Sequence, residues 1–134
     1  MSQLKTMTRN QFEDIAEAVF KDLPKLFGDK IDNVHIAVED YPSEDILHNM
    51  RTSKTSLLGL YQGIPLTHRG TWYGTSPTIP DKISLFQANI EAVCKTDEEI
   101  SERIREVLLH ELGHYFGMNE SEIRNAMKNF KPLN

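Results

Sequence analysis

The chain of 134 residues has little cysteine and no long apolar run. Its single cysteine, Cys94, cannot form an internal disulfide, which fits a reducing compartment, and we expect it to pack as a small apolar side chain. No apolar stretch approaches the ~18 residues that a membrane span needs, and no signal-peptide pattern follows Met1. These absences predict a cytoplasmic protein that does not associate with membranes.

Charge and composition exclude further classes of protein. Fifteen basic and 20 acidic side chains give a net charge of −5, and such a surface repels the phosphate backbone of nucleic acids. The hydrophobic fraction of 39% and the charged fraction of 26% are ordinary for a globular protein, which excludes disorder and fibrous structure. The length predicts one domain over residues 1–134.

Hydrophobic periodicity predicts helices at both ends of the chain. The N-terminal helix begins with a capping box of Thr8 and Gln11, is interrupted at Pro24 and stops at Gly28. Its apolar face comprises Phe12, Ile15, Ala16, Val19, Leu23, Leu26 and Phe27. Near the C-terminus, a second helix runs from the capping pair Thr96 and Glu99 to about Phe116, with an apolar stripe of Ile100, Ile104, Val107, Leu108 and Leu112.

Between these helices the periodicity changes to that of strands. We predict four short strands at residues 34–38, 57–62, 71–73 and 82–86, with a polar loop over residues 41–56. A further short helix follows Gly117, with Asn119 and Glu122 as its capping box. The sequence therefore predicts an α+β domain in which a small mixed sheet of about four strands packs against helices.

The long C-terminal helix contains the pattern HExxH, formed by His110, Glu111 and His114. Residues four apart share one helix face, so the two imidazoles can converge on one metal ion while Glu111 reaches a water on that ion. Zinc suits two neutral imidazoles and a carboxylate, with a fourth position left for water. On the alternative interpretation, both histidines are ordinary polar positions on a half-buried helix.

Two downstream residues favour the metal site. Gly117 can adopt the positive φ that ends the helix and reverses the chain, and this reversal can bring Glu120 back as a third ligand. In a shuffled chain of this composition, HExxH with a glycine and an acid at these offsets would arise roughly once in eight thousand sequences. Glu122, two residues further on, would point to another side of a helix and is the weaker candidate.

The stretch from Val107 to Glu120 resembles the bacterial minimal zincins (mini-zincins), small predicted zinc-dependent proteases with a matrix-metalloprotease-like motif, HExxHxxGxxD. Residues 58–67 and 80–86 are similar to the strand, loop and following strand of that family, so the resemblance covers roughly residues 8–123. It implies a minimal zincin-like fold with zinc as cofactor, His110 and His114 as ligands and Glu111 as general base. The family's third ligand is Asp, where this chain has Glu120, a longer acid that can still bind zinc.

The resulting hypothesis is a zinc-dependent metallopeptidase that acts on a peptide or protein substrate. Glu111 would take a proton from the attacking water and deliver it to the leaving amine. The substrate is expected to add as a strand to a sheet edge at residues 71–74 or 83–87. Candidates for a further oxyanion donor are His68, Arg69, Tyr73 and Tyr115, although packing or surface exposure is favoured for each.

Two other interpretations stay open. The chain could be a catalytically weak zincin-fold module that binds or regulates a protein partner, because its third ligand departs from the family pattern and no second subdomain walls off a cleft. Alternatively, the histidines could hold a purely structural metal. A small domain with an open sheet edge is also compatible with a homodimer.

Overall fold

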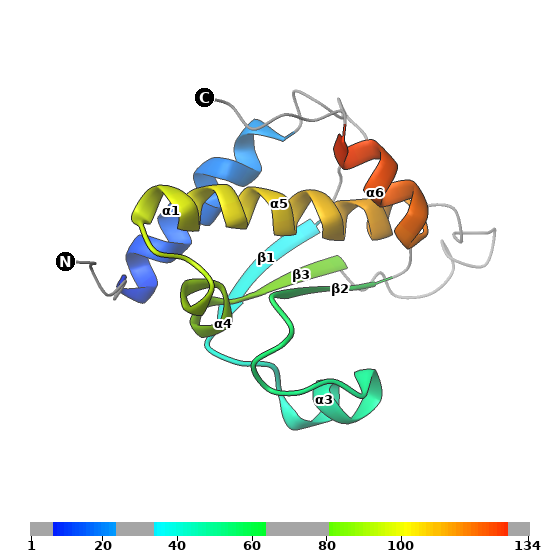
Figure 1. Ribbon diagram of the computed structural model, residues 1–134, viewed down its shortest axis with the longest axis horizontal. Coiled ribbons are helices and arrows are strands. Elements are labelled where there is room, and N and C mark those ends of the chain that lie inside the picture. The colour runs from blue at the N-terminus through cyan, green and yellow to red at the C-terminus, as the bar shows by residue number, and fades with distance from the viewer. Residues whose placement is uncertain (1–6, 24–33, 64–80, 129–134) are drawn as a thin grey trace.

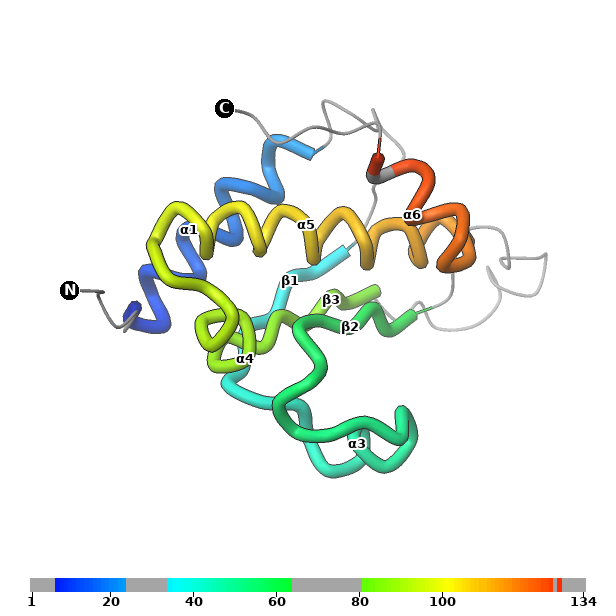
Figure 2. Tube along the Cα trace, viewed as in Figure 1, coloured from blue at the N-terminus to red at the C-terminus, as the bar shows by residue number. Residues whose placement is uncertain are grey.

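The computed structural model describes residues 7–23, 34–63 and 81–128, and these form an α+β structure (Figure 1). The helices α1 and α5 lie on one face of a small sheet, and α6 folds back over the C-terminal end of α5 (Figures 1 and 2). The elements are α1 (Arg9–Asp22), β1 (Val34–Glu39), α3 (Glu44–Met50), β2 (Gly59–Gln62), β3 (Asp81–Phe86), α4 (Gln87–Ala92), α5 (Asp97–Tyr115) and α6 (Glu120–Lys128). The predicted fold class is confirmed.

The sheet has three strands in the order β1-β3-β2. Strand β1 runs parallel to β3 and β2 runs antiparallel to it, with Gly59 opposite Leu85 and Gln62 opposite Lys82. Three of the four predicted strands are therefore present, and the fourth, at residues 71–73, lies outside the described residues.

The prediction of a sheet edge at residues 83–87 is wrong, because β3 is the central strand. The reason is visible in its side chains: Ile83, Leu85 and Phe86 have no exposed surface, and even Ser84 is buried. A strand that is buried on both faces has a near-continuous run of apolar residues, whereas a half-exposed strand alternates apolar and polar residues. In the described sheet, the edges are β1 and β2. The other predicted edge, residues 71–74, lies outside the described residues.

The predicted loop over residues 41–56 contains a helix, α3, which corrects that prediction. Ser43 caps it by accepting a hydrogen bond from the amide of Ile46, and Glu44 and Asp45 lie in its first turn, where acids favour a helix. Arg51 ends it in the left-handed conformation, with φ of 53°. The helix buries no residue completely, so its sequence lacks the apolar stripe by which longer helices are recognised.

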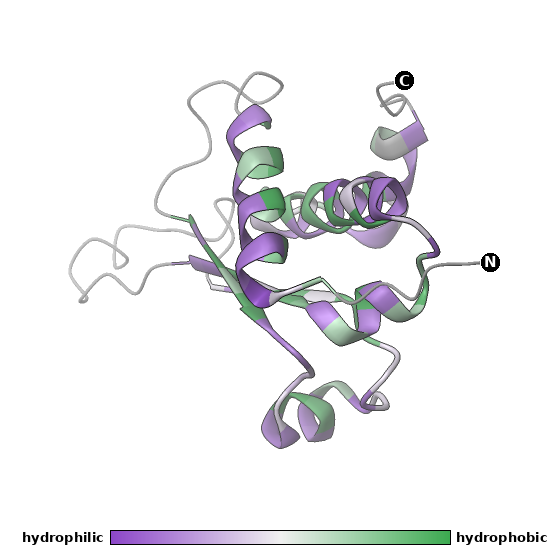
Figure 3. Ribbon diagram, turned by 90° about the vertical axis from the view of Figure 1, so that its left-hand side faces the viewer, coloured by the Kyte–Doolittle hydropathy of each residue, from purple (hydrophilic) through white to green (hydrophobic). Residues whose placement is uncertain are grey.

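The core forms where α1 and α5 meet the sheet, and Figure 3 shows apolar segments of these helices turned inward. The predicted stripe of α5 is buried throughout, and Phe12 and Ala16 of α1 pack in the same cluster together with Leu23, the C-cap of α1. Cys94 is buried in it as well, which confirms its predicted packing role. Among the described residues, no helix is both long enough and apolar enough to cross a bilayer.

The predicted helix caps are largely confirmed. Thr8 and Gln11 form both hydrogen bonds of a capping box, at 2.9 and 3.0 Å. Thr96 accepts from the amide of Glu99 at 3.1 Å, but the Glu99 carboxylate accepts from the amide of Lys95 instead of that of Thr96. The predicted stop at Gly28 lies outside the described residues.

Two glycines allow elements to approach closely. A Cβ at Gly59 would lie 2.5 Å from Val107 Cγ1, so only glycine lets β2 pack this closely against α5. A Cβ at Gly113 would lie 2.5 Å from Ile123 Cγ1, which is where α6 packs on α5. Both distances are shorter than real carbon–carbon contacts, so both packing arrangements depend on the missing side chain.

We expect Gly113→Ala to lower the free energy of unfolding by about 1–3 kcal/mol, because the added methyl group overpacks the contact between α5 and α6. Urea denaturation of the metal-free protein measures this change. A second substitution, Ile123→Ala, removes the clashing atoms, so the double variant should be less destabilised than the sum of the two single variants. Additive losses would contradict the close contact.

Candidate metal centre

The two histidines of the HExxH pattern lie on one face of α5 near its C-terminal end, as predicted. Their ring centroids are 5.2 Å apart and the rings are inclined by 73°. About one third of each side chain is exposed, 35% for His110 and 33% for His114. The imidazoles are therefore accessible from solvent while their backbone is fixed by a buried helix.

The chain reverses directly after this helix. Gly117 has φ of 81°, its amide donates to His114 O, and the amide of Met118 donates to Gly113 O, both at 2.9 Å. This pair of bonds is the Schellman arrangement that satisfies the last carbonyls of a helix. The predicted role of Gly117 as a left-handed terminator is confirmed.

The reversal brings Glu120, the first residue of α6, back to both histidines. Its Oε1 lies 3.3 Å from His110 Nε2 and its Oε2 lies 3.0 Å from His114 Nε2. The reciprocal hydrogen bonds between Asn119 and Glu122, each 2.8 Å, cap α6 and hold its first turn in place. The Glu122 carboxylate is engaged in this cap, which leaves Glu120 as the acid that faces the histidines.

This set of side chains fits a zinc ion. Ligand atoms bound at about 2.0–2.1 Å in a tetrahedral site are about 3.3 Å from one another. The distances from Glu120 to the two imidazoles, 3.0 and 3.3 Å, are close to that separation. Two imidazole nitrogens and a carboxylate are also a donor set that zinc accepts while keeping a position for water. The same distances also suit ion pairs between Glu120 and protonated imidazoles. A measurement of metal binding distinguishes a metal site from these ion pairs.

Glu111 lies beside the histidines but faces the sheet. Its Oε1 accepts a hydrogen bond of 2.8 Å from the amide of Tyr61 in β2, and the side chain is buried, with 7% exposed. Its carboxylate and the nitrogens of His110 and His114 lie within 4.8 Å of one another, so these three groups could also hold a metal ion. Burial raises the pKa of Glu111 and the nearby Glu120 raises it further, whereas the Tyr61 amide and His114 act in the opposite direction.

The Tyr61 amide belongs to the outer edge of β2. The amide of Phe86 in β3 donates to Leu58 O at 3.0 Å, which places this pair of residues at a hydrogen-bonded position of the antiparallel ladder. Hydrogen-bonded and non-hydrogen-bonded residue pairs alternate along an antiparallel pair of strands. The backbone groups of Leu60 therefore point toward β3, and those of Gly59 and Tyr61 point outward. Glu111 therefore contacts the side of β2 that has no neighbouring strand among the described residues.

A cavity of about 530 Å³ surrounds the three convergent side chains. Its wall includes Met50 of α3, with 47% of its surface exposed, and Met118 of the chain reversal. Neither was predicted as a site residue, because α3 was missed and Met118 belongs to none of the motifs described above. The other lining residues are Leu57, Gly59, Leu60, Tyr61, Gly63, His110, Glu111, His114, Gly117 and Glu120.

The remaining candidates lie elsewhere. Tyr115 is completely buried and its ring packs against Tyr61 and Phe116, in agreement with the packing alternative for this residue. The other proposed oxyanion donors, His68, Arg69 and Tyr73, lie outside the described residues.

Comparisons with known proteins bear on the family and the fold of the chain. A profile of the family described as zincin-like metallopeptidase matches residues 31–128. A solved structure, a conserved hypothetical protein from T. thermophilus, has a similar fold, with a TM-score of 0.52 and 20% sequence identity over 91% of this chain and 100% of the other. A search of curated proteins finds no match. Because the profile covers most of the chain, including the whole of α5 and α6, the chain belongs to the zincin-like metallopeptidase family.

Proposed function

We propose that this chain is a zinc-dependent metallopeptidase in which His110, His114 and Glu120 hold the metal and Glu111 is the general base. The observation that carries the proposal is the position of Glu120, whose two carboxylate oxygens lie at 3.3 and 3.0 Å from the two imidazoles.

When bound, zinc lowers the pKa of its water toward about 7 and polarises the carbonyl to be attacked. Glu111 takes a proton from the water as its oxygen bonds to the carbonyl carbon, and passes this proton to the amine nitrogen as the C–N bond breaks. The Tyr61 amide fixes Oε1 of Glu111, so Oε2 is the atom that carries the proton. In the metal-free chain, burial raises the pKa of Glu111, which makes its carboxylate a stronger base.

The substrate is proposed to bind along the outer edge of β2, which borders the cavity. The outward carbonyl groups of Gly59 and Tyr61 and the amide of Gly59 are the groups that would hydrogen-bond an extended peptide added as a strand, because the Tyr61 amide is held by Glu111. This placement replaces the edge predicted at residues 83–87 and lies directly beside Glu111.

Purified protein should bind about one zinc ion per chain, and His110→Ala or His114→Ala should abolish this binding. Glu120→Ala should lower the affinity at least tenfold, whereas Glu122→Gln, which removes a neighbouring negative charge but keeps the acceptor for the Asn119 amide, should retain it. Metal analysis after dialysis and competition with a chelating dye measure these affinities. A chain that loses zinc in mild dialysis yet retains a protein partner would favour the alternative of a catalytically weak module.

Glu111→Gln should retain zinc and lower peptide turnover by about 10²–10⁴-fold, the usual contribution of a general base. Glutamine can still accept the hydrogen bond from the Tyr61 amide, so the geometry of the site is preserved. Turnover equal to that of the parent chain would contradict the assignment, and an ordered metal with no turnover in either protein would favour a structural metal site.

The same variant should change the pH dependence of stability in the metal-free protein. Because the pKa of Glu111 is raised in the folded state, the folded chain loses stability as the pH rises from the unfolded pKa, near 4.5, through the folded one. Glu111→Gln should therefore have the higher Tm at pH 7, and the difference should disappear near pH 4. Thermal melts with a chelator at both pH values measure it, and a lower Tm at pH 7 would contradict burial as the dominant cause.

A further inference from the structure

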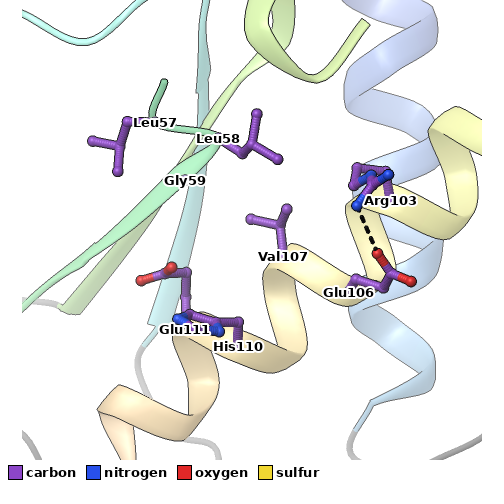
Figure 4. Close-up of a pocket in the computed structure, with 8 residues that line it drawn as sticks. All are labelled: Leu57, Leu58, Gly59, Arg103, Glu106, Val107, His110 and Glu111. Atoms are coloured by element: carbon purple, nitrogen blue, oxygen red, sulfur yellow. Dashed lines mark hydrogen bonds and ion pairs between the residues drawn. The ribbon is translucent and has the colours of Figure 1, made fainter. Parts of the chain in front are cut away.

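A groove of about 670 Å³ lies between α1 and β1, at the opposite edge of the described sheet from β2. Figures 1 and 3 show these two elements next to each other. The hollows at the candidate metal centre, one of which is drawn in Figure 4, are lined by α5 and β2 and share no residue with this groove. A ligand in the groove, which we call the β1 groove, therefore leaves the metal centre accessible.

The floor of the β1 groove is apolar. Val34, Ile36 and Val38 of β1 pack half-buried against the core, and Ala16 and Phe20 of α1 line the same groove. The three β1 side chains and Phe20 keep part of their surface exposed. A chain that covers them removes apolar surface from water, which is favourable.

The backbone of β1 offers an open strand edge on this side. Val38 O accepts a hydrogen bond of 3.0 Å from the guanidinium of Arg9, so the backbone groups of Val38 point away from β3. Every second residue of a strand directs its backbone groups to the same side, so those of Val34 and Ile36 also point outward. Among the described residues, no strand lies on this side of β1. An extended peptide added there gains backbone hydrogen bonds as well as contact with the floor.

The rim that α1 forms carries charge of one sign. Glu13, Asp14 and Glu17 line the β1 groove with exposed side chains, and none of them forms an ion pair with another described residue. The described lining contains no lysine or arginine, and the nearby Arg9 is already paired with Asp40 at 2.6 Å. The β1 groove therefore attracts positive charge.

The spacing of two of these acids matches that of side chains on a strand. Glu13 and Glu17 are one turn apart on α1, which is about 6 Å along the helix axis. Side chains at alternate positions of a strand lie on one face, about 6.6–6.8 Å apart. Two basic side chains at alternate positions of an added strand can therefore each meet one carboxylate.

We propose that the β1 groove binds an extended basic segment of a partner protein, which adds to β1 as a strand and pairs two alternate Lys or Arg residues with Glu13 and Glu17. A second copy of this chain fits less well, because symmetric pairing of two β1 edges brings two sets of the same carboxylates together. The net charge of −5 adds to that repulsion. The proposal is independent of the proposed peptidase function.

The test is binding of a fluorescein-labelled peptide of sequence TVTKTKTV, measured by fluorescence anisotropy at low salt. The double variant Glu13→Gln, Glu17→Gln should bind it about tenfold more weakly, because both ion pairs are lost. The matched control is Glu98→Gln, Glu102→Gln, which removes the same charge at the same spacing from an exposed face of α5 that does not line the β1 groove. This control should retain the parent affinity, and melting temperatures of both variants control for loss of fold.

Two further peptides separate strand pairing from general attraction between opposite charges. The isomer TVTKKTTV, whose lysines would point to opposite faces of a strand, should bind at least threefold more weakly, and TVTETETV should not bind. Hydrogen exchange of the Ile36 amide, which points outward, should slow at least tenfold when TVTKTKTV binds.

Several outcomes would overturn the proposal. These are no binding of TVTKTKTV, equal loss of affinity in the two double variants, equal affinity for the isomer, or unchanged exchange at Ile36. Sedimentation of the free chain tests the other occupant. A dimer that protects the Ile36 amide and excludes the peptide would assign the β1 groove to a second copy of this chain. If the peptide binds as predicted but the chain cleaves no peptide bond, the β1 groove stands and the peptidase proposal fails.

Discussion

The candidate site depends on one packing contact, the close approach of α6 to the last turns of α5. Gly113, within the HExxH pattern itself, has no side chain to keep Ile123 away, and Gly117 adopts the left-handed conformation that turns the chain. Together they place Glu120 against both imidazoles in only six residues from His114. The helix reversal thus supplies the third member of the proposed donor set from the helix that directly follows α5.

The other half of the site depends on contact between α5 and the sheet edge. Gly59 allows β2 to lie against Val107, and at this distance the Tyr61 amide reaches the Glu111 carboxylate. The same strand edge that is proposed to bind the peptide therefore also orients the proposed base. Asn89 holds the segment that leads into β2 in place, because its side-chain amide donates to Lys54 O and Leu57 O, both at 2.8 Å.

The parts that could be predicted are those governed by local sequence. The capping boxes at Thr8 and Asn119, the apolar stripe of α5 and the left-handed Gly117 each have a pattern within a few residues. Helical spacing predicted that His110 and His114 would face the same side, and the return of Glu120 followed from the expected turn.

The parts that were missed depend on tertiary contacts. The helix α3 has no buried face, so its start at Ser43 was not distinguished from a loop, and with it Met50 was missed as a cavity residue. The central position of β3 depends on long-range pairing with β1 and β2, which local alternation does not specify. The hydrogen bond from the Tyr61 amide to Glu111 joins residues that are 50 positions apart in the sequence. Its donor is a backbone group, so the type of residue at position 61 does not indicate the bond.

A crystal structure of the zinc-loaded chain would show which side chains bind the ion. We expect one ion within about 2.0–2.2 Å of His110 Nε2, His114 Nε2 and one Glu120 oxygen, with Glu111 outside the coordination shell and still bonded to the Tyr61 amide. An ion held by Glu111 in place of Glu120, or histidines that bind no common ion, would contradict it.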